Sequence, residues 1–179
     1  MIIGTKRLLE LVKDINLVEG LCKRELTNPE GAGFDFRVGE IFTLSGEGFL
    51  GVQQRSTPET TSVAKYGKDK FYMLKPRECV LVRTIESVNL PENMIMAVAP
   101  RTTLLRSGVA LIHSNTAPGY HGKLNWGLKN LRDDASFKLS LGARIALVQF
   151  YETTENISQY RGQWNGGRVS SEGKRHRQV

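Results

Sequence analysis

Hydrophobic residues recur at helical spacing near the start of the chain and at strand spacing over most of the remainder. In residues 5–15, TKRLLELVKDI, the apolar side chains fall on one face of a helix. The residues on that face are Leu8, Leu11, Val12 and Ile15. Thr5 stands at the position of an N-cap residue. The pattern predicts a short amphipathic helix packed on the body of the protein.

Beyond Gly31 the pattern is that of short β-strands. Turn-forming residues separate the apolar runs CVLVRTIESVNL (79–90), MIMAVAP (94–100) and GVALIHS (108–114). The run ARIALVQFYE (143–152) is apolar on both faces, which is typical of a strand buried on both sides. Residues 51–70 are polar and without pattern, so we expect a long loop there. Gly and Pro recur at intervals typical of a β-sandwich or β-barrel.

The segment KLNWGLKNL (123–131) alternates strictly between apolar and polar positions. Leu124, Trp126 and Leu128 point to one face. The opposite face holds Lys123, Asn125, Gly127 and Lys129. A glycine inside a strand weakens it, and it marks either the close approach of a ligand or backbone, or a bulge or packing contact. Both interpretations apply to Gly127.

Length and composition indicate one soluble globular domain. The 179 residues, of which 40% are hydrophobic and 24% charged, suffice for a domain with its own core. No run approaches the ~18 apolar residues of a membrane-spanning helix, and charges interrupt the first residues, where a signal peptide would be apolar. We expect a cytoplasmic protein with one domain over residues 1–160 and a C-terminal tail over residues 161–179.

The tail carries much of the formal net charge of +7. Its cations are Arg161, Arg168, Lys174, Arg175 and Arg177, against Glu172 alone. A solvated tail and a cationic flap over a polyphosphate both fit this composition. Nucleic-acid binding is not expected, because Tyr160 and Trp164 do not form the run of aromatics that a single-strand platform needs.

Cysteine and histidine usage argues against a metal site. Cys22 and Cys79 are too few for a disulfide framework or a closed zinc site, and we expect two buried thiols. We expect no zinc, because the paired Cys-x-x-Cys of zinc-dependent deaminases is missing. His113 and His121 flank the turn NTAPGY (115–120), but two histidines without a third ligand make a weak case for a metal.

Two segments carry groups that suit a nucleotide. PRTTLLRSG (100–108) offers two guanidiniums and two hydroxyls, which either bind phosphate oxygens or lie on the surface at a strand end. GAGFDFRVG (31–39) places Asp35 next to Arg37. This carboxylate either pairs with Arg37 or caps a turn, or it holds a metal-bound water or a deoxyribose hydroxyl.

These segments, in this order, resemble the dUTPase and dCTP deaminase superfamily, and the dCTP deaminase branch more closely. The resemblance runs from the N-terminus to near residue 171. It rests on MIIGTKRLLELV, GAGFDFRVG, PRTTLLRSG, APGYHGKL, LGARIALVQF and QYRGQWNGGRVSS. It implies a mostly β fold like a distorted jelly-roll barrel, assembled as a homotrimer. It also implies nucleotide sites at the subunit boundaries, closed by the C-terminal segment.

The resemblance assigns residues to a bound deoxynucleoside triphosphate. The implied triphosphate contacts are Arg101, Thr102, Thr103, Arg106 and Gln163. The implied base and deoxyribose contacts are Asn115, Thr116 and Tyr120. Magnesium would accompany the triphosphate without a direct protein ligand, and Asp35 is the candidate for holding its water. Gln159 departs from the pattern, because the deaminase branch usually has a lysine there.

The catalytic acids of both branches are missing. Ala117 stands where dUTPases carry the aspartate that orients the attacking water, and Gly127 stands where dCTP deaminases carry the glutamate base. From Val109 to Arg132 the chain has no Asp or Glu. A positioned acid or base contributes ~10²–10⁴-fold to such a reaction. Its loss should leave binding largely untouched, because phosphate affinity comes from the arginines.

Three functions stay open at this point. The first is an enzyme that deaminates a pyrimidine deoxynucleoside triphosphate, or cleaves it to the monophosphate, with rearranged acid–base residues. The second is a nucleotide-binding sensor or regulator without catalysis. The third is a scaffold whose basic tail meets an acidic partner. The sequence does not identify the base, because this superfamily reads bases largely through main-chain groups.

Overall fold

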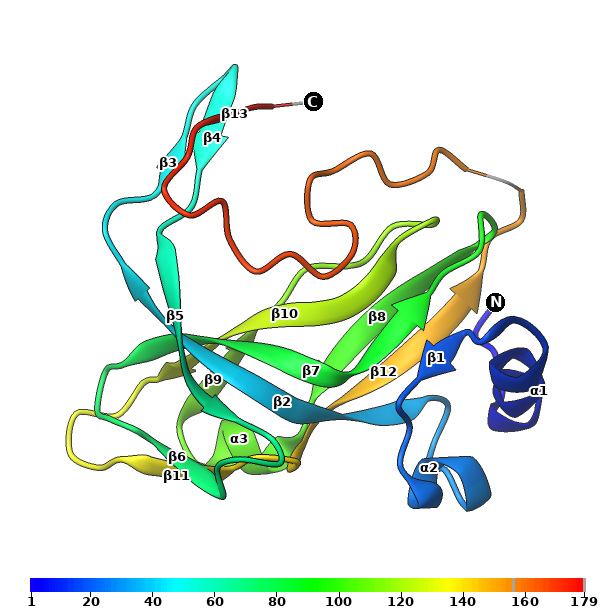
Figure 1. Ribbon diagram of the computed structural model, residues 1–179. Coiled ribbons are helices and arrows are strands. Elements are labelled where there is room, and N and C mark those ends of the chain that lie inside the picture. Colours follow the sequence, from blue (N-terminus) through cyan, green and yellow to red (C-terminus); the bar gives the residue numbers. More distant parts are fainter. Residues whose placement is uncertain (156, 179) are drawn as a thin grey trace.

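A curled sheet forms the body of the protein (Figure 1). The structure is a computed structural model that describes residues 1–155 and 157–178. Its helices are α1 (Thr5–Ile15), α2 (Lys23–Thr27) and α3 (Thr102–Arg106). Its strands are β1 (Val18–Glu19), β2 (Phe34–Ser45), β3 (Phe49–Leu50), β4 (Gln54–Ser56), β5 (Glu59–Lys65), β6 (Phe71–Leu74), β7 (Cys79–Asn89), β8 (Met94–Pro100), β9 (Val109–Ile112), β10 (His121–Asn130), β11 (Phe137–Ser140), β12 (Arg144–Glu152) and β13 (His176–Arg177).

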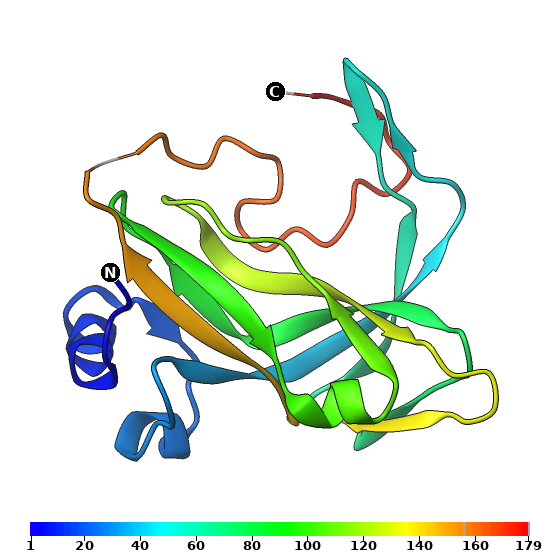
Figure 2. The ribbon, with the colours of Figure 1, turned by 180° about the vertical axis from the view of Figure 1, so that it is seen from behind.

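The main sheet is nearly closed into a barrel. Within the described residues it has eight strands in the order β8-β12-β2-β7-β10-β9, with β1 paired to β7 and β5 paired to β2. A bridge between Met96 of β8 and Thr116 joins one edge strand to the connection between β9 and β10. Strands β6 and β11 form a small sheet at one end, and β3, β4 and β13 form another that projects from the opposite end (Figures 1 and 2). The mostly β, barrel-like fold predicted from the sequence is confirmed.

The predicted N-terminal helix is present over the predicted residues. Leu8 and Leu11 of α1 are buried against the barrel. Two details of the prediction are wrong: the N-cap is Gly4, and Ile15 is 45% exposed. Ile15 ends the helix, and the next residue turns the chain with a left-handed φ of 53°. None of the helices in the described part of the chain is long and apolar enough to cross a membrane.

The strand predictions hold for the apolar runs and fail for the polar one. Runs 79–90, 94–100 and 108–114 contain β7, β8 and β9. The long loop predicted at 51–70 is wrong, because β4 and β5 lie there. Most side chains of β5 face solvent or are half-buried, so the strand carries no apolar face in its sequence. Strand β12 is fully buried on one face only, so burial on both faces was predicted wrongly.

Strand β10 alternates as the sequence predicted. Leu124, Trp126 and Leu128 are buried in the core, whereas the residues between them are half-buried or exposed. Gly127 lies opposite Ile112 of β9, and a Cβ added to this glycine would lie 3.2 Å from the Cβ of Ile112. Gly127 thus makes room for a neighbouring strand, which agrees with the packing interpretation.

The prediction of two buried thiols is wrong. Cys79 is exposed and Cys22 is half-buried. Cys79 begins β7 on the face opposite to Val80, which takes the core position. Cys22 precedes α2 as its N-cap residue, outside the barrel.

Candidate functional site

A cavity of about 370 Å³ lies between the barrel and the C-terminal segment 157–178. We call it the tail cavity. Strand residues Leu44, Leu81 and Asn125 form its floor, and the turn before β10 forms one wall. The C-terminal segment contributes Tyr160, Trp164, Arg168, Val169 and Ser170. The predicted base and deoxyribose contacts, Asn115, Thr116 and Tyr120, all line this cavity.

Two tyrosines form an aromatic corner of the tail cavity. The rings of Tyr120 and Tyr160 meet edge to face, with their centroids 5.5 Å apart. The Tyr120 hydroxyl donates a hydrogen bond of 2.8 Å to the carbonyl oxygen of Lys123. Burial, and to a lesser degree the neighbouring Tyr160, raises the pKa of Tyr120 to about 12. Tyr120 is therefore a neutral, rigid wall at physiological pH.

Glycines allow the C-terminal segment to dock directly on β10. A Cβ on Gly122 would lie 2.6 Å from backbone atoms of Gly166 and Gly167, which is closer than any side chain can pack. The backbone N–H of Gly166 donates to the carbonyl oxygen of His121 at 2.8 Å. The Asn125 side-chain amide donates to the carbonyl oxygens of Gly167 and Arg168, both at 3.2 Å. The segment is thus anchored to the barrel through main-chain groups.

A second anchor fixes the end of the same segment. Thr57 and Ser171 exchange hydrogen bonds: the Thr57 N–H donates to Ser171 Oγ at 2.7 Å, and the Ser171 N–H donates to Thr57 Oγ1 at 2.8 Å. Beyond them, β13 pairs with β4. Among the tail cations, Arg168 lines the cavity, whereas Arg175 stacks over the ring of Phe49 at 4.9 Å.

The tail cavity offers hydroxyl, amide and aromatic groups but no acid. Among the described residues that line it, Arg168 is the charged one and none is Asp or Glu. Gly127, the position of the missing glutamate, lies outside the lining. The carboxylate that contacts the wall is Glu172, which accepts hydrogen bonds from the hydroxyls of Ser170 and Thr60. These bonds, Ser170 first, lower the pKa of Glu172.

Charged side chains lie together at the other end of the barrel, around Asp35. This carboxylate is 3% exposed, and its Oδ2 accepts hydrogen bonds from Arg101 and Arg144, each at 2.7 Å, and from Arg24 at 3.4 Å. Of the alternatives that the sequence left open for Asp35, pairing with Arg37 is wrong. Arg37 pairs instead with the fully buried Glu86, its Nε lying 2.6 Å from Oε1.

Burial dominates the electrostatics of Glu86 and raises its pKa, although the backbone and side chain of Arg37 oppose that shift. The strands next to β2 supply the partners of both residues. Arg144 of β12 contacts Asp35, and Glu86 of β7 contacts Arg37. Asp35 and Arg37 are close in the sequence and opposite in charge, but each forms its ion pair with a residue from another strand.

The predicted triphosphate contacts do not converge within one chain. Arg101 lines two cavities beside α3; Thr103 lines one of them and Thr102 the other. Arg106 is exposed at the end of α3. Gln163 lies in the C-terminal segment at the opposite end, and its side-chain O and N have no hydrogen-bond partner among the described residues.

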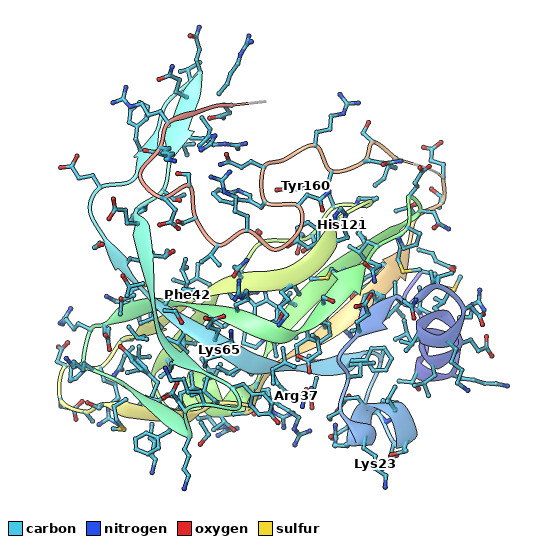
Figure 3. The ribbon with its side chains drawn as sticks, in the orientation of Figure 1. Lys23, Arg37, Phe42, Lys65, His121 and Tyr160 are labelled. Atoms are coloured by element: carbon cyan, nitrogen blue, oxygen red, sulfur yellow. The ribbon has the colours of Figure 1, made fainter. Side chains whose placement is uncertain are left out.

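The two ends are separated by most of the length of β8. Thr116, at the tail cavity, is bridged to Met96, and Arg101 directly follows the strand. At about 3.3 Å per residue these points are roughly 16 Å apart. Figure 3 shows His121 beside the C-terminal segment, to which Tyr160 belongs, and Figure 1 shows α3 at the opposite end of the barrel.

Metal-binding residues are not clustered in the described part of the chain, where no three His, Cys, Asp or Glu side chains lie close enough to hold an ion. Asp35 fits a cation poorly, because three guanidiniums surround the carboxylate. Neither Asp35 nor His121 lines the tail cavity.

The known proteins that this chain resembles include enzymes that act on deoxynucleotides. A family model described as dCTP deaminase-like matches residues 4–153. The deoxyuridine 5'-triphosphate nucleotidohydrolase of Methanocaldococcus jannaschii is 29% identical over 136 residues, which cover 75% of this chain and 85% of that protein. A dUMP-forming dCTP deaminase of Dictyoglomus thermophilum is 30% identical over 124 residues, which cover 66% of this chain and 63% of that protein.

A solved structure confirms the fold. The crystal structure of 2'-deoxycytidine 5'-triphosphate deaminase from Agrobacterium tumefaciens matches with a TM-score of 0.63 at 15% identity. The match covers 83% of this chain and 47% of the other, so this chain spans less than half of that protein. The family match extends from the start of α1 through β12 and so includes α3 and the turn before β10, but not the C-terminal segment that lines the tail cavity. The chain belongs to the dCTP deaminase-like family.

Proposed function

We propose that this protein binds a pyrimidine deoxynucleoside triphosphate and deaminates it or hydrolyses it to the monophosphate. The observation that carries the proposal is the division of groups between the two ends of the barrel. Neutral aromatic, hydroxyl and amide groups line the tail cavity, as a base and sugar require. Guanidiniums and threonine hydroxyls gather beside α3, as a triphosphate requires.

Assembly as a homotrimer would join these ends. A single chain separates the base-type contacts from the phosphate-type contacts along β8. A ring of three chains places one end of each chain next to a different surface of its neighbour. In this arrangement Asn115, Thr116 and Tyr120 of one chain and Arg101, Thr102, Thr103 and Arg106 of another act on one nucleotide.

Magnesium would bind together with the triphosphate. The ion takes oxygen ligands and keeps several waters, so phosphate oxygens suffice to hold it. The guanidiniums around Asp35 fit a structural role for this carboxylate better than contact with a metal-bound water. Arg168 and Gln163 of the C-terminal segment then cover the bound nucleotide.

Nucleotide binding without turnover is the second candidate function. It is favoured by the lining of the tail cavity, which among the described residues contains no Asp or Glu. Deamination and hydrolysis both need a group that moves protons at the reacting atom. Under this proposal the protein is a sensor or regulator that retains the binding site.

Incubation with each deoxynucleoside triphosphate, with and without magnesium, tests the two candidates. Products are separated by anion-exchange chromatography, and binding is followed by the shift in thermal unfolding, since a ligand specific to the folded state stabilises it. A peak of dUTP, dUMP or dCMP supports the enzyme. Saturable stabilisation with full recovery of every substrate supports the sensor. Absence of both effects contradicts the proposed function.

Two variants locate the binding site. Arg106→Ala should remove the nucleotide-dependent stabilisation, whereas Arg7→Ala, which removes the same charge from the exposed face of α1, should keep it. Mixed assemblies of Arg106→Ala chains and Tyr120→Ala chains should regain part of the binding, because some boundaries then combine two intact halves. Failure of the mixture to bind would contradict a site shared between chains.

A further inference from the structure

The guanidiniums around Asp35 leave most of their donors unused. Arg101 and Arg144 each reach Oδ2 of Asp35 through Nη1. Asp35 is their one side-chain hydrogen-bond partner within residues 1–155 and 157–178. A guanidinium has five N–H donors, so each of these arginines holds further donors for another acceptor. Their side chains are 35% and 34% exposed, so a ligand from solvent can reach them.

The shared oxygen also forces like charges together. Because both Nη1 atoms lie 2.7 Å from one atom, the two guanidiniums are close neighbours and repel each other. Asp35 is the carboxylate that these two guanidiniums share, whereas the neighbouring Arg24 also pairs with Glu25 and Glu30. A second anion at this place would relieve the repulsion.

The two cavities beside Arg101 differ in charge. The larger, about 340 Å³, is lined by Arg101 together with the carboxylates of Asp35 and Glu30. The smaller, about 210 Å³, is lined by Arg101, Arg144 and Lys138, with the hydroxyls of Thr103 and Ser140, and no acid among its described residues. We call the smaller one the arginine cavity. Because its charged lining residues are all cations, the arginine cavity suits an anionic ligand.

We propose that Arg144 and Lys138 bind phosphate groups in the arginine cavity together with Arg101, and that Asp35 is the positioning residue that holds the two arginines. The inference deepens the proposed function, on which it rests, by naming the cavity and the further cations that receive the triphosphate. Guanidinium forks match phosphate oxygens, and the lysine ammonium adds a point charge. Lys138 reaches this position from β11 while its ammonium lies 4.3 Å from the ring centre of Phe71.

An irregularity in β12 delivers Arg144 to this place. The pairing of β12 with β2 shifts register between Arg144 and Ala146, and two consecutive residues, Ile145 and Ala146, are buried. Such a bulge re-aims one side chain relative to regular alternation. Arg144 thereby meets Asp35 across the sheet instead of continuing the outer face of the strand.

Binding of inorganic tripolyphosphate to the full chain tests the inference, with dCTP and dUTP measured alongside. Arg144→Gln removes one proposed contact. Lys138→Gln removes another without touching Asp35, so it reports on the site even if the first variant folds poorly. Arg7→Gln is the matched control, since it removes one positive charge from an exposed ion pair on α1. Isothermal titration calorimetry gives the dissociation constants, and far-UV circular dichroism verifies folding.

We expect Arg144→Gln to weaken tripolyphosphate binding by on the order of 10-fold or more, because it removes charge-assisted hydrogen bonds. We expect Lys138→Gln to weaken it by about 3-fold to 10-fold, because the charge that it removes is screened by solvent. Arg7→Gln should stay within about 2-fold of the unmodified protein. If folded Arg144→Gln and Lys138→Gln bind dCTP or dUTP as tightly as Arg7→Gln does, the inference is overturned while the proposed function stands. If tripolyphosphate binds with this dependence but no nucleotide binds, the anion site stands and the proposed function fails. If nothing binds to the unmodified protein, both fail.

Discussion

The two ends of the barrel present different chemical groups, and different parts of the chain supply them. At the tail cavity, main-chain contacts of glycines and the uncharged side chains of Asn125 and Tyr120 shape the space. At the arginine cavity, Arg101 at the start of α3, Lys138 of β11 and Arg144 of β12 line the space, and the two arginines share the buried carboxylate of Asp35. Under the proposed function, the first end would select a ligand by shape and hydrogen bonding, and the second would attract it by charge.

The difference explains how binding can persist where the catalytic acids are missing. Under the proposed function, affinity for a triphosphate would reside at the arginine end, where Arg101, Lys138 and Arg144 line the cavity. Reactivity toward a base would reside at the tail end, where Ala117 and Gly127 replace the acids that the relatives' pattern leads one to expect. The ends are joined by the rigid strand β8, so either can change without rebuilding the other.

The largest effect should come from Asp35→Asn at the arginine end. The neutral amide would leave the guanidiniums of Arg101 and Arg144 without their carboxylate partner, whereas Arg24 keeps Glu25 and Glu30, so we expect a loss of about 3 kcal/mol in the free energy of unfolding. Urea denaturation measures it. Asp133→Asn, which breaks an exposed ion pair with Arg77, is the control and should cost about 0.5 kcal/mol or less. Equal losses in the two variants would contradict the central role of Asp35.

The sequence predicted features that depend on contacts between nearby residues, and it missed those that depend on contacts between distant residues. The α1 helix and the alternation of β10 depend on residues a few positions apart, and both were read correctly from spacing. The partner of Asp35 could not be found in this way. Arg101, which follows β8, and Arg144 of β12 are distant from Asp35 in the sequence, whereas the neighbouring Arg37 faces Glu86 across the sheet.

Edge positions and irregular pairing limited the rest of the prediction. Strand β5 pairs with β2 at one side and has few buried residues, so its polar sequence resembles a loop. The register shift that turns Arg144 toward Asp35 has no signature in LGARIALVQF. The turn residues Asn115, Thr116 and Tyr120 were placed together because the resemblance spans one continuous segment.

Gly122→Ala should separate the tail from the barrel. The added methyl group would overlap the backbone of Gly166 and Gly167, and Gly122 has a φ of 122°, so we expect a loss of about 2–3 kcal/mol in stability and release of the tail. Limited proteolysis within residues 161–178 measures the release. Gly46→Ala carries a similar backbone strain, with φ 85°, but meets open space. Equal proteolysis in both variants would contradict docking through close glycine contact.

Alkaline pH should weaken the tail end through Tyr120. Its pKa is about 12 in the folded protein and near 10 in an unfolded chain, so the unfolded state loses its proton first as the pH rises. Stability that is fully present below pH 10 is therefore lost progressively between about pH 10 and pH 12, by on the order of 2 kcal/mol. Melting curves across this range for the unmodified protein and Tyr120→Phe measure the contribution. Tyr72, whose pKa is also about 12, remains in both proteins and sets the residual slope. Identical slopes in the two proteins would remove Tyr120 as a cause.

Ser171→Ala should produce the smallest effect and the clearest separation of the two ends. The variant removes the acceptor of the Thr57 N–H, and because Ser171 is fully buried, water does not replace it. We expect a loss of about 1 kcal/mol in stability, faster hydrogen exchange at the Thr57 amide, and faster exchange along β4 and β13. Ser45→Ala, at an exposed serine that ends β2, should change neither quantity. Because the arginine cavity shares no residue with this anchor, tripolyphosphate affinity should stay within about 2-fold of the unmodified protein. A parallel loss of tripolyphosphate affinity would mean that the tail and the arginine end are coupled, and it would contradict the independence of the two ends.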